Sequence, residues 1–406
     1  MWENILCEFT FENLSAIIIN SSLSGDFMKK LNKELLKSNI EKIAEYDFEN
    51  NKVFGSAYCV IQGEDEVYKK CFGTKSLNST EPVTENTIFR LASMTKPVTA
   101  SAILILVERG LLSLDDKISE YLPEFKDVHV TRISELGSLI DSGEAKNEIT
   151  VCNLLTHTSG IGSEPLKEVK MTFEDKKSLD ATVRFYAKIG LDFEPGTKQQ
   201  YSGTGAFDVL ARIIEKVTNT DYHKFLQREI FEPCGMKNTT FIPTKEQWGK
   251  IIAMHKKENG KNCEEKMIGD CVFSDFPCTH YLGGAGLVST LYDYSKFAKM
   301  LLNKGRTEKK QIISENTFKL LHTPFVSEKI MPGNERWGLG VRVIVSENYE
   351  NLPVGAFGWS GAYGTHFWID PQNNIVAIYM KNSLFDGGAG NESARNFEKA
   401  VRESLI

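Results

Sequence analysis

Residues 89–100 (FRLASMTKPVTA) hold the two side chains whose types and spacing are best suited to chemistry. Ser93 is followed three positions later by Lys96, and the chain contains no second Ser-x-x-Lys. The apolar run that follows, up to Gly110, predicts a buried helix beginning near Ser93. Side chains three positions apart share one face of a helix, so the hydroxyl and the amine can meet. Such a pair suits acyl transfer, in which a serine attacks a carbonyl group and a poorly hydrated lysine takes up its proton.

A purely structural interpretation uses the same residues. Ser93 can cap the helix while Lys96 lies in solvent in the first turn. Pro97 is compatible with either arrangement, because proline is favoured at the start of a helix. The pair alone therefore leaves catalysis and capping open.

The composition is that of an ordinary soluble globular protein. Of the 406 residues, 41% are hydrophobic and 25% are charged, which suits a chain of about two or three domains' worth of structure with a large core. The net charge of −6 gives no support for binding to nucleic acid. The eight cysteines include no Cys-x-x-Cys pair, so we expect free thiols in a reducing compartment.

Nothing in the sequence predicts insertion into a membrane or export. No run approaches the ~20 apolar residues of a membrane span. Residues 1–27 contain no lysine or arginine and only a short apolar centre, unlike a secretory signal. We therefore expect a cytoplasmic protein in which residues 1–27 are an N-terminal extension and residues 28–406 form the folded domain.

Hydrophobic periodicity indicates which elements must position the Ser93 stretch. Residues 28–45 predict an amphipathic helix, and the β-rich runs 53–62 and 66–73 predict a hairpin. Residues 93–280 are mainly helical in pattern, apart from polar excursions that include 136–148 and 245–280.

The last hundred residues turn to β structure before a closing helix at 391–404. Four runs predict consecutive strands: 338–345, 354–359, 364–370 and 374–381. Strands at both ends of the chain imply an α+β fold (an α/β sandwich). We expect one antiparallel sheet formed from both chain ends (28–92 and 281–406) and flanked by helices, with an all-helical insertion between them.

Two further motifs follow the Ser93 stretch along the chain. Tyr201-Ser202-Gly203 precedes a predicted helix, and Trp359-Ser360-Gly361 lies on a predicted inner strand. The order and spacing of the three motifs resemble the serine β-lactamase and penicillin-binding-protein-like superfamily. The similarity is greatest to its carboxylesterase branch and to the class C β-lactamases.

The resemblance covers the chain from about Phe54 to the C-terminus. Supporting stretches are LLTHTSGI (154–161), GGAGLVSTLYDYSKFAKML (283–301) and GWSGAYGTHFWIDP (358–371). Within the first of these, we expect His157 to be a hydrogen-bonded structural histidine beside a turn. The resemblance implies a β-lactamase/transpeptidase-like fold.

The resemblance also implies a mechanism. Ser93 attacks a carbonyl group and becomes acylated, while Lys96 and Tyr201 manage its proton. The base is either a neutral Lys96 or a phenolate form of Tyr201. An ordinary tyrosine is mostly neutral at pH 7, so the second scheme needs a nearby cation.

The remaining site residues come from the third motif. The backbone N–H groups of Ser93 and Ala362 are expected to hold the oxyanion. Trp359, Ser360 and Gly361 are expected to line the substrate site. No metal or organic cofactor is needed.

Two departures from the superfamily pattern bear on the substrate. Trp359 stands where β-lactamases and peptidases have the cation of Lys-Thr-Gly or His-Thr-Gly, and Gly203 stands where they have asparagine. Both changes weaken the antibiotic or peptide interpretation and favour an ester. His366 is close to the third motif in sequence, but we expect it to be a strand residue rather than a substitute for the cation.

We therefore expect a serine hydrolase that cleaves small carboxylic esters through a Ser93 acyl-enzyme. A β-lactamase or D-amino-acid peptidase or amidase on the same scaffold is the first alternative. An acyltransferase and a catalytically silent binding protein are the others. The expected partner is a small-molecule ester or amide, and the oligomeric state is left open. The chain contains neither Gly-x-Ser-x-Gly nor His-Glu-x-x-His, so an α/β-hydrolase and a zinc hydrolase have no support.

Overall fold

A computed structural model describes residues 28–163, 166–265, 276–277, 279–388 and 390–406. The expected extension at 1–27 lies outside the described residues. The helices are α2 (Lys33–Glu49), α3 (Lys96–Glu108), α4 (Val151–Leu155), α5 (Phe173–Lys176), α6 (Leu179–Ile189), α7 (Gly205–Thr218), α8 (Tyr222–Leu226), α9 (Glu232–Cys234), α10 (Lys245–Trp248), α11 (Leu291–Leu302), α12 (Glu315–Leu321) and α13 (Glu392–Glu403). The strands are β1 (Gly55–Gln62), β2 (Asp65–Gly73), β3 (Ile88–Arg90), β4 (His129–Ile133), β5 (Leu139–Glu144), β6 (Met254–Glu258), β7 (Lys261–Glu265), β8 (Val288–Thr290), β9 (Glu335–Trp337), β10 (Arg342–Ile344), β11 (Phe357–Ser360), β12 (His366–Asp370) and β13 (Ile375–Met380).

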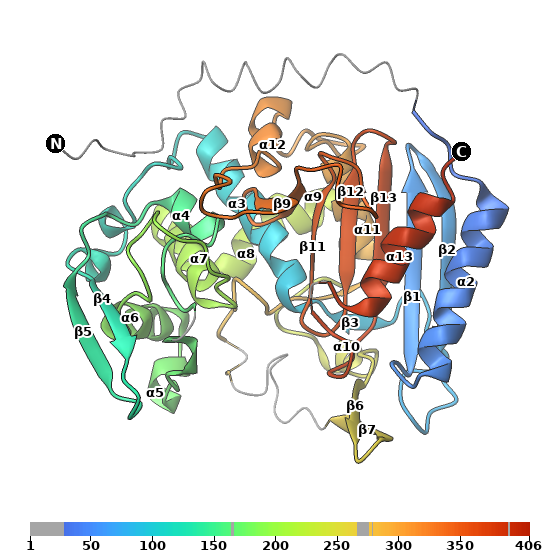
Figure 1. The fold of residues 1–406 in the computed structure, drawn as a ribbon, viewed down its shortest axis with the longest axis horizontal. Coiled ribbons are helices and arrows are strands. Elements are labelled where there is room, and N and C mark those ends of the chain that lie inside the picture. Colours follow the sequence, from blue (N-terminus) through green and yellow to red (C-terminus); the bar gives the residue numbers. More distant parts are fainter. Residues whose placement is uncertain (1–27, 164–165, 266–275, 278, 389) are drawn as a thin grey trace.

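One sheet joins the two ends of the chain (Figure 1). Its seven strands run in the order β2-β1-β13-β12-β11-β10-β9, and every neighbouring pair is antiparallel. Strand β1 pairs directly with β13, with Tyr58 opposite Tyr379. The expected antiparallel sheet built from both chain ends is confirmed.

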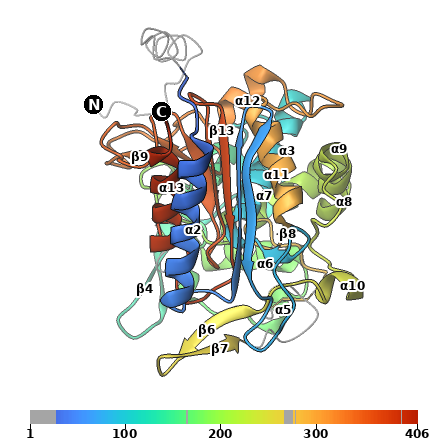
Figure 2. The same ribbon diagram turned by 90° about the vertical axis from the view of Figure 1, so that its right-hand side faces the viewer.

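Helices cover both faces of this sheet. Figures 1 and 2 show α2 and α13 side by side against one face, and α3 and α11 on the other side. The first pair packs on the sheet through an apolar cluster that contains Leu36, Ile40, Trp368 and Phe397. All six residues of β13 (IVAIYM) are buried, which is why it reads as a continuous apolar run and not as an alternating strand.

The part of the chain between β3 and β8 is mainly helical. It also contains two hairpins, β4–β5 and β6–β7, which the expectation of an all-helical insertion leaves out. Strand β5 (LIDSGE) is exposed along most of its length, so it has no apolar alternation by which to recognise a strand. None of the helices formed by the described residues is long and apolar enough to cross a membrane.

Candidate active site

Ser93 lies in a short 3-10 turn, η2 (Ala92–Thr95), between β3 and α3. The turn begins with Ala92 at a φ of +46°, a left-handed conformation that is strained for a residue with a side chain. Helix α3 starts at Lys96, with Pro97 in its first turn and almost every side chain buried. The predicted buried helix is therefore present. Its first residues form a tighter turn that carries the serine.

The structure brings the hydroxyl, the amine and the phenol of the three motifs together. The Tyr201 hydroxyl donates to Ser93 Oγ at 2.7 Å, and Lys96 Nζ donates to the same oxygen at 3.2 Å. The Trp359 indole N–H donates to the Tyr201 oxygen at 3.2 Å. These residues come from α3, from the loop before α7 and from β11, so distant segments converge on one serine.

Lys96 has three hydrogen-bond acceptors. Its amine donates to Ser93 Oγ at 3.2 Å, to the Gly203 carbonyl at 2.5 Å and to the Gly284 carbonyl at 2.9 Å. The side chain is fully buried and lies 4.9 Å from the centre of the Tyr201 ring. An ammonium group has three protons to donate, whereas a neutral amine has two. The surroundings of Lys96 therefore suit its charged form.

The turn that carries Ala362 is held close to the serine. We call residues 361–364, which connect β11 to β12, the β11–β12 turn. A Cβ on Gly361 would lie 2.2 Å from the Leu91 carbonyl oxygen, and Thr365 Oγ1 donates to that oxygen at 2.9 Å. Leu91 is two residues before Ser93, and β11 contacts η2. Ala362 is thus positioned beside the start of the serine turn.

The Ser360 hydroxyl points into a buried polar chain. It lies 2.7 Å from His366 Nδ1, and His366 Nε2 lies 3.1 Å from Glu398 Oε1. Burial lowers the pKa of His366, although the neighbouring Glu398 opposes this shift. The ring is therefore neutral and occupied by partners on both sides. His366 is a buried strand residue and gives the site no positive charge.

Aromatic rings pack behind Tyr201. The His157 ring lies 4.6 Å from the Tyr201 ring and 4.4 Å from Trp337, and its Nδ1 accepts the backbone N–H of Ser202 at 3.1 Å. Burial holds the pKa of His157 well below its usual value, and the Lys96 charge lowers it further. A neutral ring that anchors the Tyr201 segment fits the structural role expected for it. Trp337 was missed by the sequence reasoning, because a lone tryptophan outside the three motifs gives no signal.

Asp208 is a second residue that sequence reasoning missed. It is fully buried on α7, and neither carboxylate oxygen has a hydrogen bond of good geometry within the described part of the chain, although the Gly283 and Gly284 N–H groups are close enough to act on it. Burial raises its pKa to about 8, against the opposing effects of the Lys96 charge and of the Gly283 and Gly284 backbone N–H groups. The only signal in the sequence is a carboxylate within an apolar helical run (AFDVLA).

The chain belongs to the beta-lactamase family, whose model matches residues 36–400. The superfamily indicated by the motif order is confirmed, and with it the class of the protein, a serine hydrolase.

Individual relatives have different activities. Esterase EstB of Burkholderia gladioli is 24% identical over 384 residues, which cover 87% of this chain and 92% of EstB. The N-acetylmuramyl-L-alanine amidase of Bacillus subtilis (strain 168) is 27% identical over 396 residues, covering 90% of this chain and 83% of the amidase. Among solved structures, EstCE1, described as a hydrolase with promiscuous acyltransferase activity, has a TM-score of 0.76 at 22% identity over 91% of this chain and 99% of its own. The family model establishes the family and the solved structure shows the fold, while these relatives do not select a substrate.

Proposed function

We propose that this protein is an esterase that hydrolyses small neutral carboxylic esters through an acyl-enzyme on Ser93. The observation that carries the proposal is the meeting of Tyr201, Lys96 and Ser93, with two donors within 3.2 Å of one hydroxyl oxygen. A helix cap would need neither the phenol nor the buried amine.

The hydrogen bonds favour Tyr201 over Lys96 as the base. Lys96 has an acceptor for each proton of its ammonium form, so it has no vacant position for a further proton. Tyr201 receives the Trp359 N–H on its oxygen and lies next to the Lys96 charge, and both contacts stabilise a phenolate. A phenolate at this position is in line to accept the Ser93 proton, since the two oxygens are 2.7 Å apart.

The reaction then proceeds in two steps. Tyr201 takes the Ser93 proton as Oγ attacks the ester carbonyl, and the N–H groups of Ser93 and Ala362 bind the developing oxyanion. Tyr201 returns the proton to the leaving alkoxide, which departs as an alcohol and leaves the acyl group on Ser93. In the second step, water gives its proton to Tyr201 and attacks the acyl group, so the acid is released and Ser93 regains its proton.

The substrate class follows from what surrounds these groups. The third motif offers the Trp359 indole instead of a cation, and Trp337 packs on it at 4.5 Å between ring centres. Such a wall suits apolar groups and gives no ion pair to a substrate carboxylate. Gly203 has no side chain to bind the amide of a peptide or lactam. These features support an uncharged ester.

The test compares Ser93→Ala with Ser101→Ala. Ser101 is a matched control because it is a buried serine of the adjoining helix α3, and its hydroxyl donates to the Pro97 carbonyl, away from Tyr201. We expect the first variant to lose p-nitrophenyl butyrate turnover by at least about 10³-fold and the second to retain it. Mass spectrometry should find the butyryl group on the Ser93 peptide.

Three outcomes would contradict this function. Wild-type activity in Ser93→Ala would remove Ser93 from the mechanism. Faster turnover of nitrocefin than of the ester would move the substrate class to lactams. No labelling of Ser93 by a fluorophosphonate probe would indicate a silent binding protein.

A further inference from the structure

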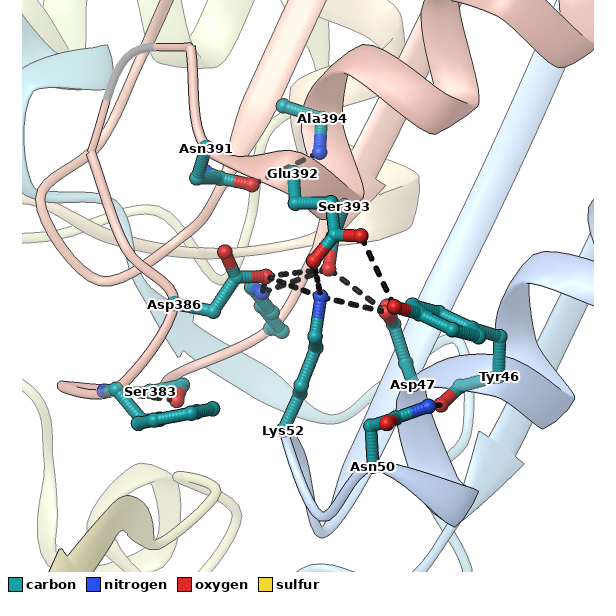
Figure 3. A network of polar contacts seen from close by, with 12 residues as sticks. Tyr46, Asp47, Asn50, Lys52, Ser383, Asp386, Asn391, Glu392, Ser393 and Ala394 are labelled. Atoms are coloured by element: carbon teal, nitrogen blue, oxygen red, sulfur yellow. Dashed lines mark hydrogen bonds and ion pairs between the residues drawn. The ribbon is translucent and has the colours of Figure 1, made fainter.

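A cluster of charged side chains is buried where α2, β13 and α13 meet. Figure 3 shows the Lys52 side chain extended toward Asp47, Asp386 and Glu392, which come from α2, from the segment after β13 and from the start of α13. Lys381, immediately after β13, is fully buried, as is Asp47. None of these groups hydrogen-bonds to Ser93, so the cluster takes no direct part in the chemistry proposed above.

Asp386 has three partners in this cluster. Its Oδ2 accepts from Lys381 Nζ at 2.7 Å and from Ser393 Oγ at 2.5 Å, and it lies 3.8 Å from Lys52 Nζ. Lys381 Nζ also reaches Ser393 Oγ at 3.2 Å. Two amines and a hydroxyl thus hold one carboxylate. That carboxylate belongs to a segment without regular structure, residues 381–388, which we call the anchor loop.

The anchor loop contacts the β11–β12 turn through its backbone. The Gly388 N–H donates to the Gly361 carbonyl at 3.1 Å, and the Ser383 N–H donates to the Tyr363 carbonyl at 2.9 Å. A Cβ on Gly387 would lie 2.0 Å from the Ala362 carbonyl oxygen. Each of the three turn residues 361–363 therefore touches the loop that Asp386 fixes.

Lys381 touches the turn directly. A Cβ on Gly364 would lie 2.2 Å from Lys381 Cε. The methylene groups of Lys381 therefore cross the turn directly at Gly364, where there is no side chain. The same lysine supports the turn with its methylene groups and binds Asp386 with its amine. The contacts of loop and lysine both restrict the position of Ala362.

We propose that Asp386 is a positioning residue, which acts through the anchor loop to hold the Ala362 N–H where the oxyanion forms. We rest this inference on the acyl-enzyme chemistry proposed above. Burying charged groups costs free energy, and apolar side chains of similar volume often serve stability as well. The contacts of Asp386 with Lys381, Lys52 and Ser393 are directional, so they do restrict the position of the anchor loop. An oxyanion donor is effective only within a few tenths of an ångström of its place.

Two variants test this role, one at the ion pairs that fix the anchor loop and one at the contact between the loop and Ala362. Asp386→Asn removes the charge that binds Lys381 and Lys52, whereas Gly387→Ala leaves the ion pairs intact and pushes a methyl group onto the Ala362 carbonyl. Glu392→Gln is the matched control, because it makes the same carboxylate-to-amide change in the cluster. Glu392 is half exposed and has no contact with the anchor loop among its hydrogen bonds to Lys52 and Tyr46.

The readout compares p-nitrophenyl butyrate with its thionoester, in which sulfur replaces the carbonyl oxygen. Sulfur accepts hydrogen bonds weakly, so thionoester turnover depends little on the oxyanion donors. We expect Asp386→Asn and Gly387→Ala to lower kcat on the oxoester about 10-fold or more, short of the 10²–10³-fold loss of a whole donor. KM and the thionoester rate should change by less than about twofold, and Glu392→Gln should resemble the wild type.

The outcomes separate this inference from the proposed function. Equal losses on both esters, or an unchanged kcat in Gly387→Ala, would overturn the role of Asp386 while ester turnover by the wild type still stands. If Asp386→Asn does not fold, Gly387→Ala decides alone. Fluorophosphonate could label Ser93 in a wild type that turns over neither ester. In that case the rate of labelling replaces kcat as the quantity compared between the wild type and its variants. A wild type without labelling would overturn both proposals.

Discussion

Trp359 links the third motif to the proposed proton chemistry through a single hydrogen bond. Replacing it with phenylalanine keeps most of the ring and removes the N–H that reaches the Tyr201 oxygen at 3.2 Å. A hydrogen bond to a charged group contributes about 1.5–3 kcal/mol. We therefore expect kcat/KM for p-nitrophenyl butyrate to fall about 10- to 100-fold.

The matched control is Trp337→Phe. Trp337 stacks on the Tyr201 ring at 5.9 Å but donates no hydrogen bond to its oxygen. This variant should change KM and leave kcat largely unchanged. An unchanged kcat/KM in Trp359→Phe would remove Trp359 from the proposed proton chemistry.

Asp208 predicts an unusual dependence of stability on pH. Its pKa is about 8 in the folded state because of burial, against about 3.9 in the unfolded chain. Between these values the folded state holds a proton that the unfolded state has released, so the free energy of unfolding falls as pH rises. Asp208→Asn cannot titrate, and its stability relative to the wild type should grow by up to about 1.4 kcal/mol per pH unit between pH 4 and 8.

Urea unfolding of both proteins at pH 5, 7 and 9 measures this effect. Asp127→Asn is the control, since Asp127 is an exposed aspartate whose replacement should leave the pH dependence unchanged. Parallel stability curves for Asp208→Asn and the wild type would show that the buried carboxyl does not titrate in this range.

The side chains that meet at Ser93 could be predicted from the sequence, whereas the groups that support them could not. Ser93, Lys96, Tyr201 and Trp359 belong to motifs with fixed spacing. The groups that hold Lys96 are the carbonyls of Gly203 and Gly284, and every residue has a carbonyl. Only the folded chain shows which of them face the amine.

At the scale of elements, the strained backbone at the start of η2 predicts that replacing Ala92 and replacing Ala102 by glycine will affect stability differently. Ala92 has a φ of +46°, a conformation that glycine adopts without strain, while Ala102 lies in the buried interior of α3. Ala92→Gly should keep the free energy of unfolding within about 1 kcal/mol of the wild type or raise it. Ala102→Gly should lower it by about 1 kcal/mol or more, and Ala92→Val by at least as much, because a β-branched side chain is strained at positive φ.

Urea unfolding at one pH ranks the three variants. An Ala92→Gly variant that loses as much stability as Ala102→Gly would show that the left-handed residue is not under strain.

Elements with a strong apolar pattern were predicted closely, and exposed or very short ones were not. The closing helix expected at 391–404 coincides closely with α13 (Glu392–Glu403), which has a regular buried face. Strand β9 has three residues and β5 is mostly exposed, so neither contains enough apolar alternation to be recognised. The order of strands in the sheet also needed the structure, since pairing between distant strands leaves no local pattern.

At the scale of the whole molecule, Glu398 ties α13 to the sheet. Burial acts to raise its pKa, but the Arg342 charge and the hydrogen bond from His366 outweigh this effect and hold the pKa at about 2. Arg342 donates to its Oε1 at 2.8 Å. Removing one partner of a buried ion pair costs about 3–5 kcal/mol, so Glu398→Gln should destabilise the protein by that amount at pH 7.

The cost should shrink in acid. A carboxyl with a lowered pKa contributes its full stability above the unfolded value of about 4.3 and loses it as pH falls toward 2. Urea unfolding at pH 7 and pH 3 tests this, with Glu335→Gln as the control because Glu335 is the more exposed partner of Arg342. A larger deficit for Glu398→Gln at pH 3 than at pH 7 would contradict the ion pair.

The pairing of β1 with β13 affects how this protein can be made in a cell. When β1 leaves the ribosome, its partner strand is about 300 residues from being translated. At about 5–20 residues per second, the nascent hairpin waits roughly 15–60 s with an open apolar edge. Chaperones that shield such an edge, or slower induction at low temperature, should therefore determine the yield of recombinant protein more than the stability of the finished fold does.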